Sequence, residues 1–222
     1  MAEAQCVLGV FAKQPLPGAV KTRVAAETSP DFAARLSEAL LRDTLFRFRR
    51  VEAHRVLAFT PPEAGDFFDE LAQGIFVISP QSTGDLGARM AHFFREQLTQ
   101  SGRVVLIGTD SPSLPLEYVE GAFEELRSAD VVLGPASDGG FYLIGCRESV
   151  PEGIFQGVDW GEATVLGQTV ERLPAGCKLA LLPPWYDVDT LRDLAIMKCH
   201  VLAMRRAGVI LELPHLIALL HW

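Results

Sequence analysis

Short apolar runs alternate along this 222-residue chain with longer segments that have helical periodicity. Each run is rich in β-branched or aromatic residues and is bounded by Pro, Gly, Ser or Asp, which is the pattern of a buried strand. The predicted strands are Cys6–Ala12, Arg55–Phe59, Ile75–Ser79, Val104–Thr109, Val131–Gly134 and Phe141–Cys146. Strands and helices in regular succession predict an α/β fold with a mainly parallel sheet and helices on both faces.

The segments between the runs have the apolar spacing of amphipathic helices. Between positions 85 and 100, for example, Leu86, Met90 and Phe93 recur at spacings of three and four. The predicted helices are Asp31–Arg50, Asp85–Gln100, Leu116–Leu126, Glu162–Arg172 and Thr190–Arg205. Because no repeat, linker or low-complexity tract interrupts this order, we expect residues 1–222 to form a single domain.

Composition excludes several classes of protein. The net charge of −8 gives the chain no basic footprint for DNA or RNA. The four cysteines lie far apart and form no CxxC pair, so neither a zinc site nor a disulfide framework is indicated. Reduced thiols of this kind are typical of a cytoplasmic protein, and we expect that location for this chain.

The C-terminal segment, residues 208–222, is apolar but interrupted. Glu212, Pro214 and His215 break it, and it falls well short of the ~20 apolar residues of a membrane helix. We therefore expect no insertion into a membrane. The segment is expected either to pack on the core or to form the contact of a homodimer.

The loop after the first predicted strand is rich in cations. Residues 13–23 contain Lys13, Lys21 and Arg23, together with Gly18 and the Thr22 hydroxyl. Glycine lets backbone N–H groups approach an anion, and Lys and Arg supply charge that suits phosphate oxygens. Neither a Walker A loop nor the dinucleotide fingerprint G-x-G-x-x-G is present. The loop is expected to bind a polyphosphate, although its composition also fits an ordinary solvated loop.

Acidic residues follow at two places. Asp110 ends a predicted strand, where ligands of parallel sheets bind, and its carboxylate suits Mg²⁺ or Mn²⁺. Asp187 and Asp189 lie two residues apart on an extended stretch, so either could lie beside Asp110. Such a sparse set suffices for Mg²⁺, because substrate phosphates supply further ligands. Alternatively, Asp110 stabilises a turn and Asp189 caps the last long helix.

A glycine-rich turn separates the last two predicted strands. Asp138, Gly139 and Gly140 are followed there by two aromatic residues. Such a turn can approach a ligand closely, and it is also the Asp-Gly turn of an ordinary hairpin. Both interpretations can hold together, because the edge of a hairpin can form the wall of a pocket. The chain contains no G-x-S-x-G elbow and no H-E-x-x-H helix, so nothing supports nucleophilic catalysis.

Taken together, these segments resemble a family within the nucleotide-diphospho-sugar transferase (GT-A-like) superfamily, whose members are mostly described as glycosyltransferases of unknown function. The matching blocks, in the family's order, are residues 11–23, 84–90, 107–112, 134–145 and 187–190. More loosely, the chain is similar to phospholactate guanylyltransferases and molybdenum-cofactor nucleotidyltransferases. The resemblance implies a single-domain, Rossmann-like α/β sandwich with a mixed, mainly parallel sheet.

The resemblance also implies roles for individual residues. The nucleotide phosphates would be held by the loop residues Lys13, Gly18, Lys21, Thr22 and Arg23. The base and ribose would lie near residues 84–89, which include Gly84, Asp85 and Arg89. The metal ligands would be Asp110 and Asp189, and the acceptor would face Asp138, Gly139 and Gly140. The expected catalytic residues are Lys21, Arg23 and Asp110.

The implied activity is that of a transferase with a nucleotide or nucleotide-sugar donor, a small-molecule acceptor and a bound Mg²⁺ or Mn²⁺. Metal-dependent glycosyltransferases of this fold usually carry Asp-x-Asp at the central strand, whereas Ser111 and Pro112 follow Asp110 here. The split pair of Asp110 and Asp189 resembles the arrangement in nucleotidyltransferases instead. Glycosyl and nucleotidyl transfer are both open at this point, and a catalytically silent nucleotide-binding partner protein is the alternative.

Overall fold

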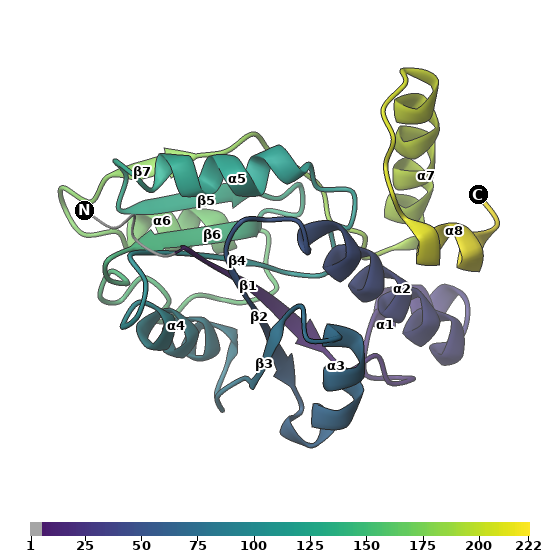
Figure 1. The fold of residues 1–222 in the computed structure, drawn as a ribbon, viewed down its shortest axis with the longest axis horizontal. Coiled ribbons are helices and arrows are strands. Elements are labelled where there is room, and N and C mark those ends of the chain that lie inside the picture. Colours follow the sequence, from purple (N-terminus) through teal and green to yellow (C-terminus); the bar gives the residue numbers. More distant parts are fainter. Residues whose placement is uncertain (1–5) are drawn as a thin grey trace.

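In the computed structural model, which describes residues 6–222, seven strands form one sheet in the order β3-β2-β1-β4-β6-β5-β7 (Figure 1). The strands are β1 (Cys6–Lys13), β2 (His54–Thr60), β3 (Val77–Pro80), β4 (Arg103–Ile107), β5 (Val131–Pro135), β6 (Phe141–Arg147) and β7 (Leu179–Leu181). Strand β6 runs antiparallel to its neighbours β4 and β5, and every other pair is parallel. The prediction of a mixed, mainly parallel sheet is therefore confirmed.

Helices cover both faces of this sheet, as the sequence predicts. One face is packed by α2 (Pro30–Phe48), α3 (Gly65–Ala72) and α5 (Leu116–Glu125), and the other by α4 (Leu86–Gln97) and α6 (Val165–Glu171). Along β1, Leu8 and Val10 pack on the face covered by α2, α3 and α5, and Val7 packs on the face covered by α4 and α6. Successive side chains of a strand point to opposite faces, so a strand that is apolar throughout is buried on both sides.

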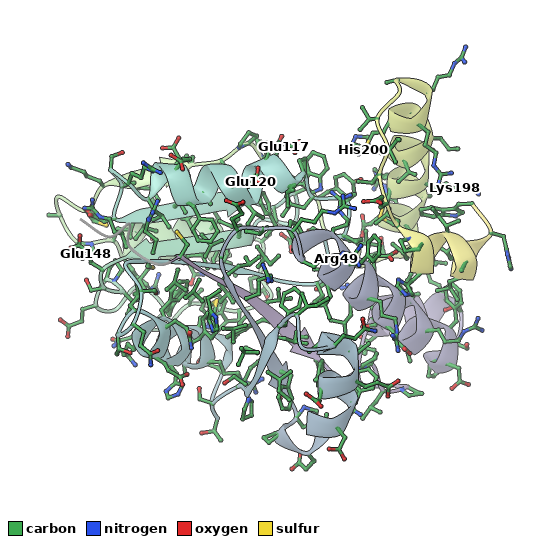
Figure 2. All side chains as sticks on the ribbon, in the orientation of Figure 1. Arg49, Glu117, Glu120, Glu148, Lys198 and His200 are labelled. Carbon is green, nitrogen blue, oxygen red and sulfur yellow. The ribbon has the colours of Figure 1, made fainter. Side chains whose placement is uncertain are left out.

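The chain ends in two helices, α7 (Leu191–Arg206) and α8 (Pro214–Leu220), of which α7 projects from the body of the molecule (Figure 1). Together with α1 (Thr22–Glu27) and part of α2 they enclose a separate, smaller apolar cluster. Figure 2 shows that His200 and Lys198 leave opposite sides of α7. His200 Nδ1 lies 2.9 Å from the Tyr186 hydroxyl, whereas Lys198 is exposed to solvent.

Asp43, a fully buried residue of α2, ties α8 to the rest of the chain. Its carboxylate accepts hydrogen bonds from the backbone N–H groups of His215 (3.0 Å) and Leu216 (2.9 Å), and it lies 2.7 Å from His215 Nδ1. N–H groups in the first turn of a helix have no partner within the helix, so a carboxylate at this position stabilises α8. The C-terminal segment thus packs on the core, which is one of the two alternatives left open by the sequence.

The sequence does not predict four short elements among the described residues: α1, α3, β7 and α8. The three helices have six to eight residues and β7 has three, which is too short for a periodic pattern to repeat. A single 3-10 turn, η1 (Pro62–Ala64), precedes α3. Within residues 6–222, no helix is both long enough and apolar enough to cross a membrane.

Gly9 of β1 allows the close approach of α4 to the sheet. A Cβ atom at this position would lie 2.4 Å from Phe93 Cζ and 2.9 Å from Leu106 Cδ1. We expect Gly9→Ala to lower the free energy of unfolding by about 1–3 kcal/mol, because a well-packed core does not accommodate an added methyl group. The measurement is urea denaturation followed by circular dichroism.

Gly121→Ala in α5 is the matched control. No atom lies within 4 Å of a Cβ at this position, so the methyl group has room. Alanine is also the better helix former, and we expect this variant to gain up to about 1 kcal/mol. Equal denaturation midpoints for the two variants would contradict the packing account of Gly9.

Asp43→Ala is expected to lower the free energy of unfolding by roughly 2–4 kcal/mol, because two backbone N–H groups of α8 lose their acceptor. Arg50→Ala is the comparison. It breaks the 2.8 Å ion pair between Arg50 and Glu212, in which both side chains are well exposed. An exposed pair contributes about 1 kcal/mol or less. A similar loss in both variants, measured by thermal and urea unfolding, would show that Asp43 does not hold α8.

Candidate functional site

A pocket of about 550 Å³, called here the carboxyl-edge pocket, opens where the parallel strands end. It is lined by the last residues of β1 and β2, Lys13 and Thr60, and by residues that follow β3 and β4, namely Gln81 and residues 108–111. Because β6 runs in the opposite direction, its first residues, Phe141 and Tyr142, reach the same edge and line the pocket as well. Ligands of open α/β sheets bind outside the carboxyl ends of the strands, and the pocket lies there.

The loop after β1 supplies cations to one wall of the pocket. The Lys13 ammonium donates to the carbonyl of Ala19 at 2.8 Å, which folds the loop back on itself. Lys21, Thr22 and Arg23 line the pocket where the loop passes into α1. Lys13 and Arg23 are exposed, and neither pairs with a carboxylate within residues 6–222. Both are therefore available to an anionic ligand.

Three carboxylates from distant parts of the chain meet in the pocket. Asp110 follows β4, whereas Asp187 and Asp189 precede α7. The backbone N–H of Val188 donates to the carbonyl of Asp110 at 2.9 Å, which fixes the strip of residues 187–189 beside the end of β4. The Ser111 hydroxyl donates to the carboxylate of Asp187. The fold thus brings Asp110 together with both of the acidic residues that the sequence left as candidates.

The ammonium group of Lys21 lies between two of these carboxylates. Its Nζ atom contacts Oδ1 of Asp110 and lies 2.9 Å from Oδ1 of Asp189, and the side chain is only 6% exposed. Burial acts to lower the pKa of Lys21, but the charges of Asp110 and Asp189 outweigh it and raise the pKa above its usual value. Lys21 therefore remains a cation in the pocket.

The backbone of Lys21 adopts the left-handed conformation, with φ 45° and ψ 48°. This conformation costs a residue with a Cβ atom about 1–2 kcal/mol. It occurs at the first position before α1, where the chain turns from the loop into the helix. The side chain of the same residue contacts Asp110 and Asp189.

Asp187 differs electrostatically from the other two carboxylates. Burial raises the pKa of Asp187 to about 7, the hydrogen bond from Ser111 opposes the shift, and the charges of Asp110, Asp138 and Asp189 add to it. Asp187 is thus bound to Ser111, whereas Asp110 and Asp189 both contact the ammonium group of Lys21.

Asp189 is not the cap of α7. That position belongs to Thr190, whose hydroxyl accepts from the backbone N–H of Asp193 (3.2 Å), while the Asp193 carboxylate accepts from the N–H of Thr190 (2.9 Å). This reciprocal pair is a capping box. The interpretation of Asp189 as a helix cap is wrong, and its carboxylate is free to contact Lys21.

Two polar residues line the pocket near the start of α4. The side-chain amide of Gln81 donates to the carbonyls of Ala58 (2.9 Å) and Ala12 (3.3 Å), bridging the ends of β2 and β1. Arg89, a predicted binding residue, donates through Nε to the carbonyl of Gly84 at 2.9 Å. The sequence analysis missed Gln81, although it directly follows a strand, which is the signal that identified Asp110.

Six predicted binding residues do not line the pocket: Gly18, Gly84, Asp85, Asp138, Gly139 and Gly140. Asp85 caps α4 by accepting from the N–H of Ala88 at 2.8 Å. Asp138 accepts from the N–H of Gly140 at 2.9 Å in the turn between β5 and β6. A Cβ atom on Gly139, which has φ +93°, would lie 2.0 Å from the Ala163 carbonyl oxygen. Asp85 and Asp138 thus stabilise local backbone turns, and Gly139 permits a close approach to the backbone of Ala163.

The pocket offers a divalent ion few ligands from the protein. Within residues 6–222 no cluster of three or more His, Cys, Asp and Glu side chains is placed to hold a metal on its own. Asp110 and Asp189 nevertheless share one cation, the Lys21 ammonium. Two carboxylate oxygens that converge on one ammonium group are the hard ligands that Mg²⁺ and Mn²⁺ prefer, and substrate phosphates would complete the coordination. The residues therefore fit the metal that the resemblance implies.

Comparison with known proteins identifies relatives of the chain. The profile of a family described as "uncharacterized protein conserved in bacteria" (DUF2064) matches residues 43–162. A crystal structure from Desulfovibrio desulfuricans G20, of a protein provisionally described as a nucleotide-diphospho-sugar transferase, is 35% identical in sequence. The match covers 90% of this chain and 88% of that chain, with a TM-score of 0.84. A comparison with curated proteins found no match.

More distant structures share the fold. One is 4-diphosphocytidyl-2C-methyl-D-erythritol synthase from Anaerococcus prevotii, which is 12% identical over 89% of this chain and 96% of that chain, with a TM-score of 0.60. Another is a cytidylyltransferase from Leptospira borgpetersenii, which is 14% identical over 90% and 87% of the two chains, with a TM-score of 0.55. At these identities the likeness establishes the fold alone.

The family profile covers more than half of the chain, and the Desulfovibrio relative matches nearly all of it. The chain therefore belongs to the bacterial DUF2064 family, and it has the fold of the nucleotide-diphospho-sugar transferase superfamily.

Proposed function

We propose that this protein is a metal-dependent transferase that binds a nucleoside triphosphate in the carboxyl-edge pocket and transfers its nucleotidyl group to a small-molecule acceptor. One observation carries the proposal. Asp110 and Asp189, which are far apart in the sequence, meet on a single buried cation inside the pocket. This split pair of carboxylates is the feature that resembles nucleotidyltransferases.

The charge distribution of the pocket supports a polyphosphate ligand. The chain as a whole has a net charge of −8, yet four cationic side chains line this pocket. They are Lys13, Lys21, Arg23 and Arg89. Arginine binds phosphate oxygens through two parallel hydrogen bonds, and lysine acts as a mobile point charge. The volume of about 550 Å³ lies within the usual range for small-molecule and cofactor sites.

In the proposed reaction an oxygen of the acceptor attacks the α-phosphorus of the nucleotide in line. The new P–O bond forms as the bond between the α-phosphorus and the bridging oxygen breaks, and pyrophosphate leaves with the electron pair. Lys21 and Arg23 bind the phosphates and neutralise the charge that develops on the leaving group. Asp110 and Asp189 would hold Mg²⁺ or Mn²⁺, which supplies further charge neutralisation at the phosphates when bound. The protein's main contribution is to position the reactants.

Glycosyl transfer is a second candidate, because the relative with 35% identity is described as a nucleotide-diphospho-sugar transferase. In that reaction the same cations would bind the diphosphate of a nucleotide-sugar, and a nucleoside diphosphate would leave. Both reactions require the loop to bind phosphates in the same way. They are therefore distinguished by the products that they release.

The product released from the donor tests the proposal. The protein is incubated with Mg²⁺, with each common nucleoside triphosphate or nucleotide-sugar, and with a set of phosphorylated and carboxylated small molecules. We expect pyrophosphate from a nucleoside triphosphate. Release of a nucleoside diphosphate from a nucleotide-sugar would establish glycosyl transfer instead. Nucleotide binding without any product would support a catalytically silent nucleotide-binding partner protein.

Arg23→Ala is expected to weaken nucleotide binding about 10- to 100-fold, because a charge-assisted contact contributes roughly 1.5–3 kcal/mol. Arg205→Ala is the matched control, since it removes an exposed arginine from the last turn of α7. Calorimetric titration with a panel of nucleotides measures both variants. If the Arg23 variant binds nucleotide as tightly as the wild type does, the loop is an ordinary solvated segment and not a phosphate-binding loop.

Asp110→Asn is expected to remove the dependence of nucleotide affinity on Mg²⁺ or Mn²⁺, because it nearly preserves the shape of the side chain but removes its charge. In the wild type, metal and nucleotide should strengthen each other's binding by the same factor. Asp66→Asn, at an exposed position in the first turn of α3, is the control and should keep the wild-type dependence. The metal assignment is wrong if the wild type binds nucleotide equally well in a chelator.

A further inference from the structure

The two carboxylates assigned to the metal are engaged by a cation from the protein itself. One oxygen of Asp110 and one oxygen of Asp189 both contact Nζ of Lys21, whose side chain is 6% exposed. A divalent ion bound by the same two oxygens would have to lie where the ammonium group lies. Two cations that compete for the same two oxygens repel strongly at such a short distance. The ammonium group and the metal ion therefore exclude each other.

We propose that Lys21 is an internal counter-ion that closes the Asp110–Asp189 pair to divalent metal ions until a nucleotide binds. On nucleotide binding, the ammonium group moves from the carboxylates to the phosphates and leaves the two oxygens to the metal. The nucleotide half of this exchange rests on the proposed function, whereas the competition between Lys21 and the metal does not.

The position of Lys21 suits such an exchange. Its side chain is a flexible four-carbon stem with a compact charge, so the ammonium group can change partners while the backbone stays in place. Lys21 lines the same pocket as Arg23, which is two residues away, and Lys13, so phosphates bound by those cations would lie within its reach. In the free protein no such anion is present, and the carboxylates hold the ammonium group.

The exchange couples the two ligands. A metal ion that binds alone must displace a buried ammonium group and leave it without a partner, so the free protein should bind metal weakly. A nucleotide offers the displaced ammonium group a new partner, so each ligand favours the binding of the other, and by the same factor. Lys21 is thus the source of the coupling and not only one of the phosphate contacts.

The test is the affinity of the nucleotide-free protein for Mn²⁺ before and after removal of the Lys21 charge. Lys21→Met keeps the apolar stem of the side chain and removes the ammonium group. We expect this variant to bind Mn²⁺ at least tenfold more tightly than the wild type, as measured by paramagnetic resonance of free Mn²⁺ and by calorimetry. Lys21→Gln, which keeps a hydrogen-bond donor near the carboxylates, is the second variant if Lys21→Met does not fold.

Two controls isolate the effect. Lys13→Met removes a cation from the same loop, but this lysine contacts the carbonyl of Ala19 and neither carboxylate, so the affinity for Mn²⁺ should stay unchanged. Adding Asp189→Asn to Lys21→Met should abolish the gain, because the second ligand is lost. A purely structural ion pair would predict lower stability in the Lys21 variants without tighter metal binding.

The proposal is overturned if the Lys21 variants bind Mn²⁺ no more tightly than the wild type, or if Lys13→Met gives the same gain. These titrations contain no nucleotide. They therefore test the competition between Lys21 and the metal ion even if the protein is not a transferase. Suppose that the wild type binds no nucleotide but Lys21→Met binds Mn²⁺ more tightly. The transferase proposal would then be wrong, and the competition between Lys21 and the metal ion would still be supported.

Discussion

The ion pairs that Lys21 forms with Asp110 and Asp189 join three segments that are distant in the sequence: the loop after β1, the end of β4 and the strip before α7. The Lys21 side chain is only 6% exposed, and a buried charge without a partner is costly, so the two carboxylates stabilise the ammonium group in this position. The contact also helps to fix where α1 begins and how the chain approaches α7. The local fold and the candidate site therefore rest on one set of charges, and a change to any member alters both.

The sheet and the edge that carries the pocket could be predicted from the sequence because their signals are local. The strand Val131–Pro135, for example, is a short run of β-branched and aliphatic residues bounded by Asp and Pro. The carboxyl ends of parallel strands lie at one edge, so the end of each strand identifies a residue near a ligand. Asp110 was identified in this way, and it lines the pocket in the structure.

The rest of the site depends on contacts that no local pattern encodes. The strip of residues 187–189 lies between β7 and α7, outside any helix or strand, and it reaches Asp110 through one backbone hydrogen bond from Val188. The contact of Lys21 with two carboxylates arises only when both lie in place, so sequence reasoning assigned these groups to separate ligands. Gln81 follows a strand as Asp110 does, but its hydrogen bonds to the main-chain carbonyls of Ala12 and Ala58 depend on how three strands align and cannot be read from the sequence.

The reversed direction of β6 gives the pocket a strand wall and a loop wall that are held in different ways. Phe141 and Tyr142 begin a strand whose backbone is paired with β4 and β5, and the Tyr142 hydroxyl donates to the carbonyl of Pro183 at 2.9 Å. The facing wall is the loop of residues 13–23, which has no strand partner along most of its length. The strand side is thus held by backbone pairing within the sheet, whereas the loop side is held by side-chain contacts, such as that of Lys13 with the Ala19 carbonyl. Substitutions in the loop can therefore retune ligand choice over evolution without disturbing the sheet.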